Sequence, residues 1–315
     1  MVVHKRMEEA QSGGKTSGTM PLTASSLLLL VCFLWGGNTV SIRISNQGIP
    51  PLLAATLRSG AAATLLWAYA RAKGEGIFLR GRDLRHAAAI GILFALDFLF
   101  LYWGLAFTHA SRGTIFLYIH PFWVAIGAHF LLPDDRLTVV KGLGLVLALA
   151  GLVSVFGSRS ATLGPRFWIG DLMELAAAIF WAATTLYIKK IVEKRPFTHY
   201  QTLFAQLFFS IPVLGAASLL FERGQSLSLT APVLGAFAYQ CVVVAFFSYL
   251  LWFWMIHRFP VSRLASFTFL APLFSVILSG LVLREPIPLL LWVGLALVGA
   301  GIYLVNRSPE ILEQS

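Results

Sequence analysis

Ten apolar runs, each about 20 residues long and joined by short polar connections, dominate this 315-residue chain. A helix of about 20 residues crosses the hydrocarbon core of a bilayer. Lipid also requires every backbone polar group to be paired within the segment, as it is in a helix. The predicted fold class is therefore an all-α integral membrane protein with ten transmembrane helices, at residues 22–44, 51–71, 84–107, 111–132, 137–157, 168–192, 199–221, 233–257, 262–283 and 286–306.

The composition agrees with membrane insertion, because 57% of the residues are hydrophobic and only 12% are charged, against about 25% charged in soluble domains. The net charge of +10 comes from short basic clusters between the apolar runs, which indicates topology rather than a nucleic-acid partner. Cys32 and Cys241 lie in distant apolar runs with no disulfide or metal-ligand pattern, so we expect buried packing residues. No cofactor and no metal site are expected.

Basic residues also predict the orientation. Of the 24 Lys and Arg residues, 17 fall on one side of the ten segments and 6 on the other. Cytoplasmic connections are the ones rich in Lys and Arg. We therefore expect a multi-pass protein of the inner membrane with both termini in the cytoplasm, the polar stretch 1–21 being a disordered tail and 307–315 a short second one.

The second half of the sequence repeats the first. Aligning Trp35 with Trp181 also pairs Thr39 with Thr185 at the same spacing, and a similar spacing later pairs Phe116 with Phe267. The stretch GLVLALAGLVSV matches GLALVGAGIYLV at 6 of 12 positions. Because each half holds an odd number of helices, the domains 22–157 and 168–306 would enter the membrane from opposite sides. Inverted repeats of this kind are typical of secondary transporters, whose substrate site lies between the repeats.

The stretches FLWGGNTVSIR, GDLMELAAAIFWAATTLYIKK and SRLASFTFLAPLFSVILSGLVLREP, with the glycine-rich last helix, resemble the drug/metabolite transporter superfamily, specifically its EamA family. The resemblance covers residues from about Leu22 to Val305, and within the family the chain is similar to amino-acid exporters of the YddG type. It implies a secondary transporter that exports small metabolites, amino acids including aromatic ones above all, by alternating access. A drug, nucleotide-sugar or other metabolite carrier of the same superfamily is the alternative.

The first apolar run carries polar and small residues that a lipid-facing helix does not need. Gly36 and Gly37 let a neighbouring helix or a substrate approach the backbone, while Asn38 and Thr39 supply hydrogen bonds and Trp35 a flat apolar wall. Helix packing alone is the competing explanation for the glycines. The resemblance adds cavity-lining aromatic residues on later helices, half of which we expect to face lipid instead: Tyr102, Trp103, Tyr118, Trp181, Tyr239, Tyr249 and Trp252.

Ionisable residues on several helices share a similar depth, which suggests a polar belt below the outer mouth. Arg58 and Asp97 would either form a fixed ion pair or leave Asp97 for the substrate. Glu174 or Asp97 would contact the substrate amino group or carry a coupling proton, and His120 would be a packing residue or a titrating one. Pro121 and Pro272, related by the repeat, break their helices at equivalent depths and are candidate hinges or fixed bends.

Other classes of protein fit less well. The stretch HFLLPD has the His-to-Asp spacing of glycerolipid acyltransferases, but a Pro precedes the Asp and no companion motif follows. We expect no enzyme activity and no catalytic residue. A channel is disfavoured because the sequence has no filter-like segment. The expected partners are a small-molecule substrate and the lipid bilayer.

Overall fold

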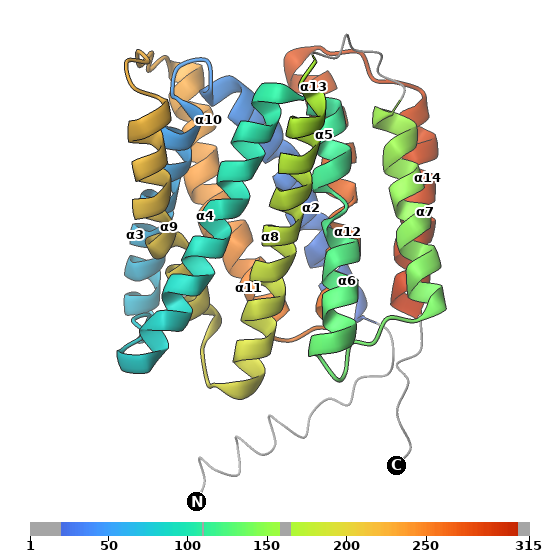
Figure 1. Ribbon diagram of the computed structural model, residues 1–315, viewed down its shortest axis with the longest axis horizontal. Coiled ribbons are helices and arrows are strands. Elements are labelled where there is room, and N and C mark those ends of the chain that lie inside the picture. Colours follow the sequence, from blue (N-terminus) through green and yellow to red (C-terminus); the bar gives the residue numbers. More distant parts are fainter. Residues whose placement is uncertain (1–19, 109, 158–164, 308–315) are drawn as a thin grey trace, which may run out of the picture.

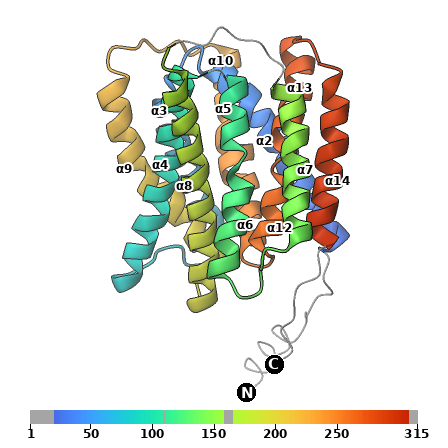
Figure 2. The same ribbon diagram turned by 45° about the vertical axis from the view of Figure 1, so that its right-hand side comes forward.

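The computed structural model describes residues 20–108, 110–157 and 165–307 as a bundle of helices that run back and forth between two ends (Figures 1 and 2). The predicted tails fall almost wholly outside these ranges. The elements before residue 157 are α2 (Leu22–Ser45), α3 (Pro51–Ala72), η1 (Gly81–Asp83), α4 (Leu84–Phe107), α5 (Ala110–Leu117), α6 (His120–Leu131) and α7 (Val139–Phe156).

The later elements repeat this order with one additional irregular segment. They are α8 (Phe167–Lys194), α9 (His199–Phe221), α10 (Ala231–Tyr239), the π-helix η2 (Gln240–Ser248), α11 (Tyr249–Ile256), α12 (Val261–Phe267), α13 (Leu270–Leu283) and α14 (Leu290–Arg307). Within the described ranges the chain forms no strand, so the all-helical class is confirmed.

Nine of the described helical segments are long and apolar enough to cross a membrane. Four of them combine shorter elements: 81–105 holds η1 with most of α4, 112–131 holds most of α5 with α6, 231–256 holds α10, η2 and α11, and 261–283 holds α12 with α13. The remaining predicted segment, α3, is a helix of 22 residues whose apolar character is reduced by Arg58 near its middle. Membrane insertion is therefore established for the chain, whereas ten crossings stay a prediction.

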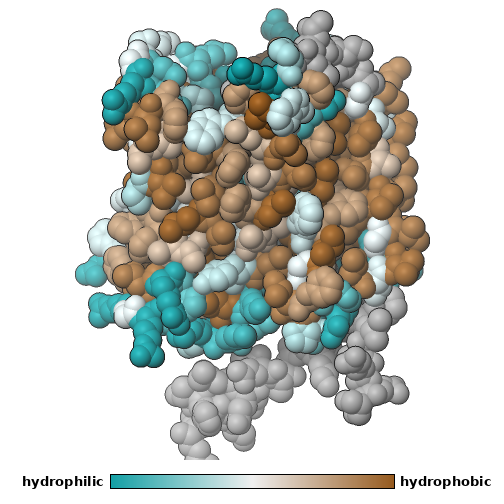
Figure 3. Space-filling view, viewed as in Figure 1, coloured by the Kyte–Doolittle hydropathy of each residue, from teal (hydrophilic) through white to brown (hydrophobic). Residues whose placement is uncertain are grey.

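We name the two ends of the bundle after α2, the Leu22 end and the Ser45 end. Helix α14 finishes at the Leu22 end with Arg307, and α3 begins at the Ser45 end with Pro51. Hydrophilic residues gather at both ends, and a hydrophobic band lies between them on the face shown in Figure 3. Large apolar side chains are exposed around the bundle, as expected of a surface solvated by lipid.

Glycines allow α7 and α14 to pack backbone against backbone at one side of the bundle (Figures 1 and 2). A Cβ placed on Gly144 would lie 2.6 Å from the carbonyl oxygen of Gly301, and one on Gly151 would lie 2.8 Å from that of Gly294. Each distance is too short for a real side chain. Small residues at these positions therefore set the distance between the helices, as is common where helices associate in lipid.

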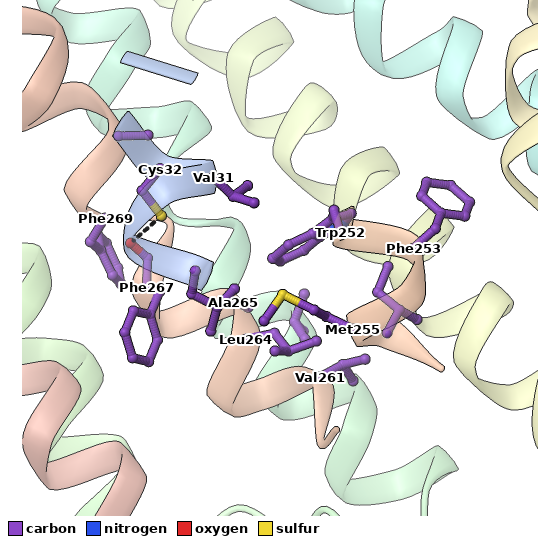
Figure 4. Packing of buried hydrophobic residues seen from close by; sticks show 14 of the residues in the cluster. Val31, Cys32, Trp252, Phe253, Met255, Val261, Leu264, Ala265, Phe267 and Phe269 are labelled. Carbon is purple, nitrogen blue, oxygen red and sulfur yellow. Dashed lines mark hydrogen bonds between the residues drawn. The ribbon is translucent and has the colours of Figure 1, made fainter. Parts of the chain in front are cut away.

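One part of the apolar core lies where α2 meets α11 and α12 (Figure 4). Cys32 of α2 donates its thiol to the carbonyl oxygen of Phe267 at 3.2 Å. Both Cys32 and Cys241 are buried and free, which confirms their prediction as packing residues. All seven residues of α12 are buried in this region.

Candidate functional site

A cavity of about 630 Å³ extends from the Ser45 end toward the middle of the bundle. Its walls come from the C-terminal half of α2, from α5, from α13 and from the connection that follows α13. Several of the lining residues carry hydroxyl groups, but most of the lining surface is apolar. The lining residues are Thr39, Arg43, Thr114, Tyr118, Phe156, Pro272, Ser275, Val276, Ser279, Glu285, Pro286 and Pro288.

Two broken helices meet the deep part of this cavity. The break between α5 and α6 precedes Pro121, and the break between α12 and α13 precedes Pro272. A Pro lacks the N–H that would continue the helix, so each break has a local cause. Interrupted helices near the bilayer middle are where transporters place substrate sites. Both residues predicted as hinges therefore lie at real helix breaks.

Aromatic side chains fill the bundle below the cavity floor. The ring of Trp35 in α2 lies 5.1 Å from Trp252, 6.0 Å from Trp181 and 6.2 Å from Tyr249, measured between ring centroids. Its indole N–H donates to the hydroxyl of Ser248 at 3.0 Å, at the end of the π-helix. Elements from both ends of the chain thus contribute to one aromatic cluster.

The cluster continues to the helix break at Tyr118. His120 stacks on Trp181 with ring centroids 3.6 Å apart and planes 12° from parallel, and Tyr118 meets Trp181 edge-on at 5.8 Å. The hydroxyl of Thr268, at the other break, lies 3.4 Å from Nε2 of His120. Six of the predicted residues are therefore gathered here: Trp35, Tyr118, His120, Trp181, Tyr249 and Trp252.

The remaining residues predicted on α2 lie between this cluster and the Ser45 end. Thr39 lines the cavity. Tyr239 donates its hydroxyl to the carbonyl oxygen of Leu34 at 3.1 Å and covers Gly37, where a Cβ would lie 2.6 Å from the Tyr239 oxygen. The side-chain oxygen of Asn38 is buried without a hydrogen-bond partner among the described residues. Gly37 thus serves helix packing, and a ligand role of Asn38 stays a prediction.

Two predicted aromatic residues lie away from the cluster. Trp103 packs edge-on against Phe221 of α9 at 4.6 Å, toward the Ser45 end of α4. Tyr102 packs near Phe98, 6.1 Å between centroids, in a separate apolar group that joins α3, α4 and α9. Both lie on α4, which has large apolar residues on every side, so the sequence did not indicate which of its aromatic residues turn toward the cavity.

Acidic residues of α8 lie against α4 and α5. Asp171 forms an ion pair with Arg112 at 2.5 Å and accepts a hydrogen bond from Thr108 at 2.7 Å. Glu174, one turn further, is fully buried, and neither carboxyl oxygen has a hydrogen-bond partner in the described part of the chain. A Cβ on Gly104 would lie 2.8 Å from its Oε1, so a glycine makes the room for this carboxyl group.

The expected fixed ion pair between Arg58 and Asp97 is not formed. No nitrogen of Arg58 lies within 4.0 Å of a carboxylate oxygen among the described residues. Arg58 lies on α3 and Asp97 on α4, too far apart for the guanidinium and the carboxylate to form an ion pair. This corrects the simpler of the two explanations for the buried charges.

Besides the partly exposed pair of Arg195 with Asp83, three ion pairs of the described residues were not predicted from the sequence. At the cavity mouth, Arg43 binds Glu285 through two hydrogen bonds of 2.5 and 2.9 Å. The second is the pair of Arg112 with Asp171. At the Leu22 end, Lys141 lies 2.9 Å from Asp135, and both are almost completely buried. Arg43 and Glu285 belong to two of the motifs quoted above, but these two partners lie 242 positions apart in sequence. No three His, Cys, Asp or Glu side chains of the described residues gather closely enough to hold a metal ion.

Comparisons with known proteins agree with the geometry. The model of the EamA-like transporter family matches residues 22–157 and again 168–307. The chain is 24% identical over 281 residues to the uncharacterized transporter YoaV of Bacillus subtilis, covering 88% of this chain and 94% of the relative. It is 28% identical to a probable amino-acid metabolite efflux pump of Salmonella typhimurium, with 88% and 93% covered.

A solved crystal structure shares the fold, with a TM-score of 0.77 at 20% identity, and the match covers 90% of this chain and 98% of that one. The family match spans most of the 315 residues in two consecutive blocks. The cavity, the broken helices and the apolar exterior are features expected of a membrane transporter. The chain belongs to the EamA-like transporter family.

Proposed function

We propose that this transporter exports small metabolites, amino acids including aromatic ones above all, across the inner membrane by alternating access. Both termini would be cytoplasmic, so the Leu22 end would face the cytoplasm and the Ser45 end the outside. The basic residues support this orientation, because Arg71, Lys73, Arg258 and Arg307 belong to the Leu22 end. The Salmonella efflux pump, named for amino-acid metabolites, supports the substrate class.

The proposal includes ten crossings arranged as two inverted five-helix repeats. Helix contacts support it, because they come in pairs that the repeat would exchange. In one such pair, α4 packs against α8, and the corresponding α10 and η2 segment packs against α2. In another, α5 and α6 pack against α8, and the corresponding helix α13 packs against α2. Each of α3 and α7 packs against its own counterpart, α9 and α14, and α6 packs against α12, the counterpart of its neighbour α5.

One observation carries the mechanism: the two repeat-related short helices have unequal surroundings. Thr114 of α5 lines the cavity at the Ser45 end. Every residue of α12, its counterpart near the Leu22 end, is buried. A transporter caught open on one side should show this inequality, and rocking of the halves would exchange the two environments.

The aromatic cluster would receive the substrate side chain. Flat rings offer large apolar surface and tolerate side chains of different shape, which suits a carrier of several amino acids. Glu174 and Asp97 are the candidates for holding the substrate amino group or a coupling proton. The cavity volume of about 630 Å³ falls within the range of small-molecule sites.

Counterflow in proteoliposomes tests this function. Vesicles containing only this protein are preloaded with an unlabelled amino-acid mixture and then given labelled amino acids outside. We expect saturable uptake that depends on the internal load. Uptake equal to that of protein-free vesicles for every amino acid would contradict the proposal. Labelled nucleotide sugars and cationic drugs, tested in parallel, would reveal the alternative carriers.

A further inference from the structure

Arg58 is an unusual residue for the interior of a membrane protein. It lies near the middle of α3 and is 1% exposed. All three of its guanidinium nitrogens lack a hydrogen-bond partner among the described residues. A guanidinium carries five N–H donors and stays protonated at any physiological pH. Burying it without a partner is costly, and charges retained inside membranes usually have a function.

The immediate surroundings of Arg58 leave these donors free. Its guanidinium lies over the ring of Phe98, 4.6 Å from the ring centroid. Such a cation–π contact stabilises the charge but uses the ring face, not the N–H groups. Asp97 lies within the electrostatic reach of Arg58, yet no ion pair joins them. No described carboxylate contacts the guanidinium of Arg58, and its hydrogen-bonding fork has no partner in the described part of the chain.

The aromatic residues connect Arg58 to the cluster below the cavity. Phe98 packs on Phe94 at 4.7 Å, Phe94 meets Tyr249 edge-on at 6.2 Å, and Tyr249 meets Trp35 edge-on at 6.2 Å. Arg58 is therefore connected to the aromatic cluster through the rings of Phe98, Phe94 and Tyr249. The occlusion fits a binding group that is reached only when the halves move.

We propose that Arg58 binds the carboxylate of the transported metabolite, so that the substrates are carboxylate-bearing compounds and above all zwitterionic amino acids. The inference rests on the proposed function and deepens it. A carboxylate accepts two parallel N–H bonds from a guanidinium. Such a carboxylate partner is what the guanidinium of Arg58 lacks among the described residues. Asp97, which forms no ion pair with any described residue, would receive the ammonium group, while the aromatic cluster would hold the side chain.

A purely electrostatic role is the competing explanation. Arg58 would then only offset the charge of Asp97, and its own donors would be unused throughout transport. The two explanations differ in what a neutral replacement does. Removing an unpaired buried charge should not lower the stability of the ligand-free protein, whereas removing a charge that stabilises its neighbour should.

The experiment compares three related compounds as competitors of labelled L-phenylalanine uptake: unlabelled L-phenylalanine, L-phenylalaninamide and 2-phenylethylamine. The last two keep the ring and the amino group but lack the carboxylate. For the wild type we expect inhibition by the acid to exceed that by the amide roughly ten- to hundredfold, the range for a charged hydrogen-bonded pair. Arg58→Gln should abolish this preference, and Arg58→Lys should retain part of it.

Arg112→Gln is the matched control, because Arg112 is also a membrane arginine but is already paired with Asp171. It should lower stability and leave the preference for the acid unchanged. The melting temperature of each purified variant, with and without L-phenylalanine, provides a second readout. We expect Arg58→Gln to melt no lower than the wild type and to lose the stabilisation by L-phenylalanine. If Arg58→Gln does not fold, two other measurements test the inference. They are the preference of Arg58→Lys for the acid over the amide, and the change in wild-type melting temperature caused by L-phenylalanine compared with that caused by L-phenylalaninamide.

An unchanged preference in Arg58→Gln would overturn the inference, as would a wild type that takes up the amide or the amine as well as the acid. In both cases transport itself would stand. Failure of the proposed function looks different, because no labelled amino acid of a complete mixture would enter vesicles containing the wild type.

Discussion

The carboxylate of Asp135, in the connection between α6 and α7, accepts hydrogen bonds from the backbone N–H of Ser262 at 2.8 Å and from its hydroxyl group. Ser262 lies in the first turn of α12, where a negative charge stabilises the helix. Lys141 completes the group by donating to Asp135 at 2.9 Å. This contact joins the two parts of the chain that the repeat relates, at the end opposite to the cavity.

Asp135→Asn should lower the stability of the protein, because it leaves the buried ammonium of Lys141 without its counter-ion. Breaking a buried pair in this way costs about 3–5 kcal/mol. The double variant Asp135→Asn with Lys141→Met should recover most of the loss, since no unpaired charge then exists. Thermal unfolding in detergent measures both effects. The exposed neighbour Asp134 provides the control, and Asp134→Asn is expected to melt like the wild type.

Trp181→Ala should impair transport while the protein still reaches the membrane. Its ring contacts Trp35, Tyr118 and His120, so its loss opens a gap in the aromatic cluster. Trp103→Ala is the matched control, because that ring packs on Phe221 away from the cluster. Initial uptake of labelled amino acids should fall at least tenfold in the first variant, against less than twofold in the second, an energy difference of about 1 kcal/mol or more. Equal effects of the two variants on uptake would contradict the role of the aromatic cluster in substrate transport.

Gly301→Ala should destabilise the contact between α7 and α14, because the new methyl group would lie 2.4 Å from the carbonyl oxygen of Gly144. Forcing such a group into packed helices costs about 1–3 kcal/mol. On the same helix, a Cβ on Gly299 meets nothing within 4 Å. Gly299→Ala should therefore be neutral or slightly stabilising, since Ala favours helix over Gly. Thermal unfolding of the two variants compares them directly, and equal melting temperatures would refute the close packing.

The proposed orientation is tested with single cysteines in a background that lacks Cys32 and Cys241. Gln225 follows α9 at the Ser45 end and Gly76 follows α3 at the Leu22 end, and both are exposed. Gln225→Cys should react with an impermeant thiol reagent added to intact cells, whereas Gly76→Cys should react only after the cells are opened. The reverse labelling pattern would indicate the opposite orientation in the membrane. Ser160, a further position predicted to lie outside, falls beyond the described residues.

Much of this architecture follows from the sequence, because apolar length fixes helices in lipid and Pro fixes breaks. The helices agree with the predicted segments to within a few residues at most ends, and the breaks lie beside Pro121 and Pro272. Which side of each helix faces the interior of the bundle is harder to predict. Helix α4 has large apolar residues on every side, so their pattern does not separate Trp103, on the periphery, from Phe94 near Tyr249.

Partners distant in sequence were also out of reach. Similar depth suggested that Arg58 and Asp97 would pair, but depth does not specify rotation about the helix axis, and the pair is not formed. The sequence predicted no role for Asp135, since its partner Ser262 is 127 positions away. The π-helix of η2 has no simple sequence signal at all.

Cysteine accessibility at Thr39 and Thr185 tests the central claim, alternating access between repeats, most directly. The sequence repeat pairs these residues, and the structure exposes Thr39 in the cavity while Thr185 is 3% exposed. In proteoliposomes, Thr39→Cys should react readily with a reagent from the Ser45 side and Thr185→Cys slowly from the Leu22 side. Adding Ser262→Ala, which weakens the contact with Asp135, should slow the first reaction and speed the second. Rates that change in the same direction, or only one that changes, would contradict the account.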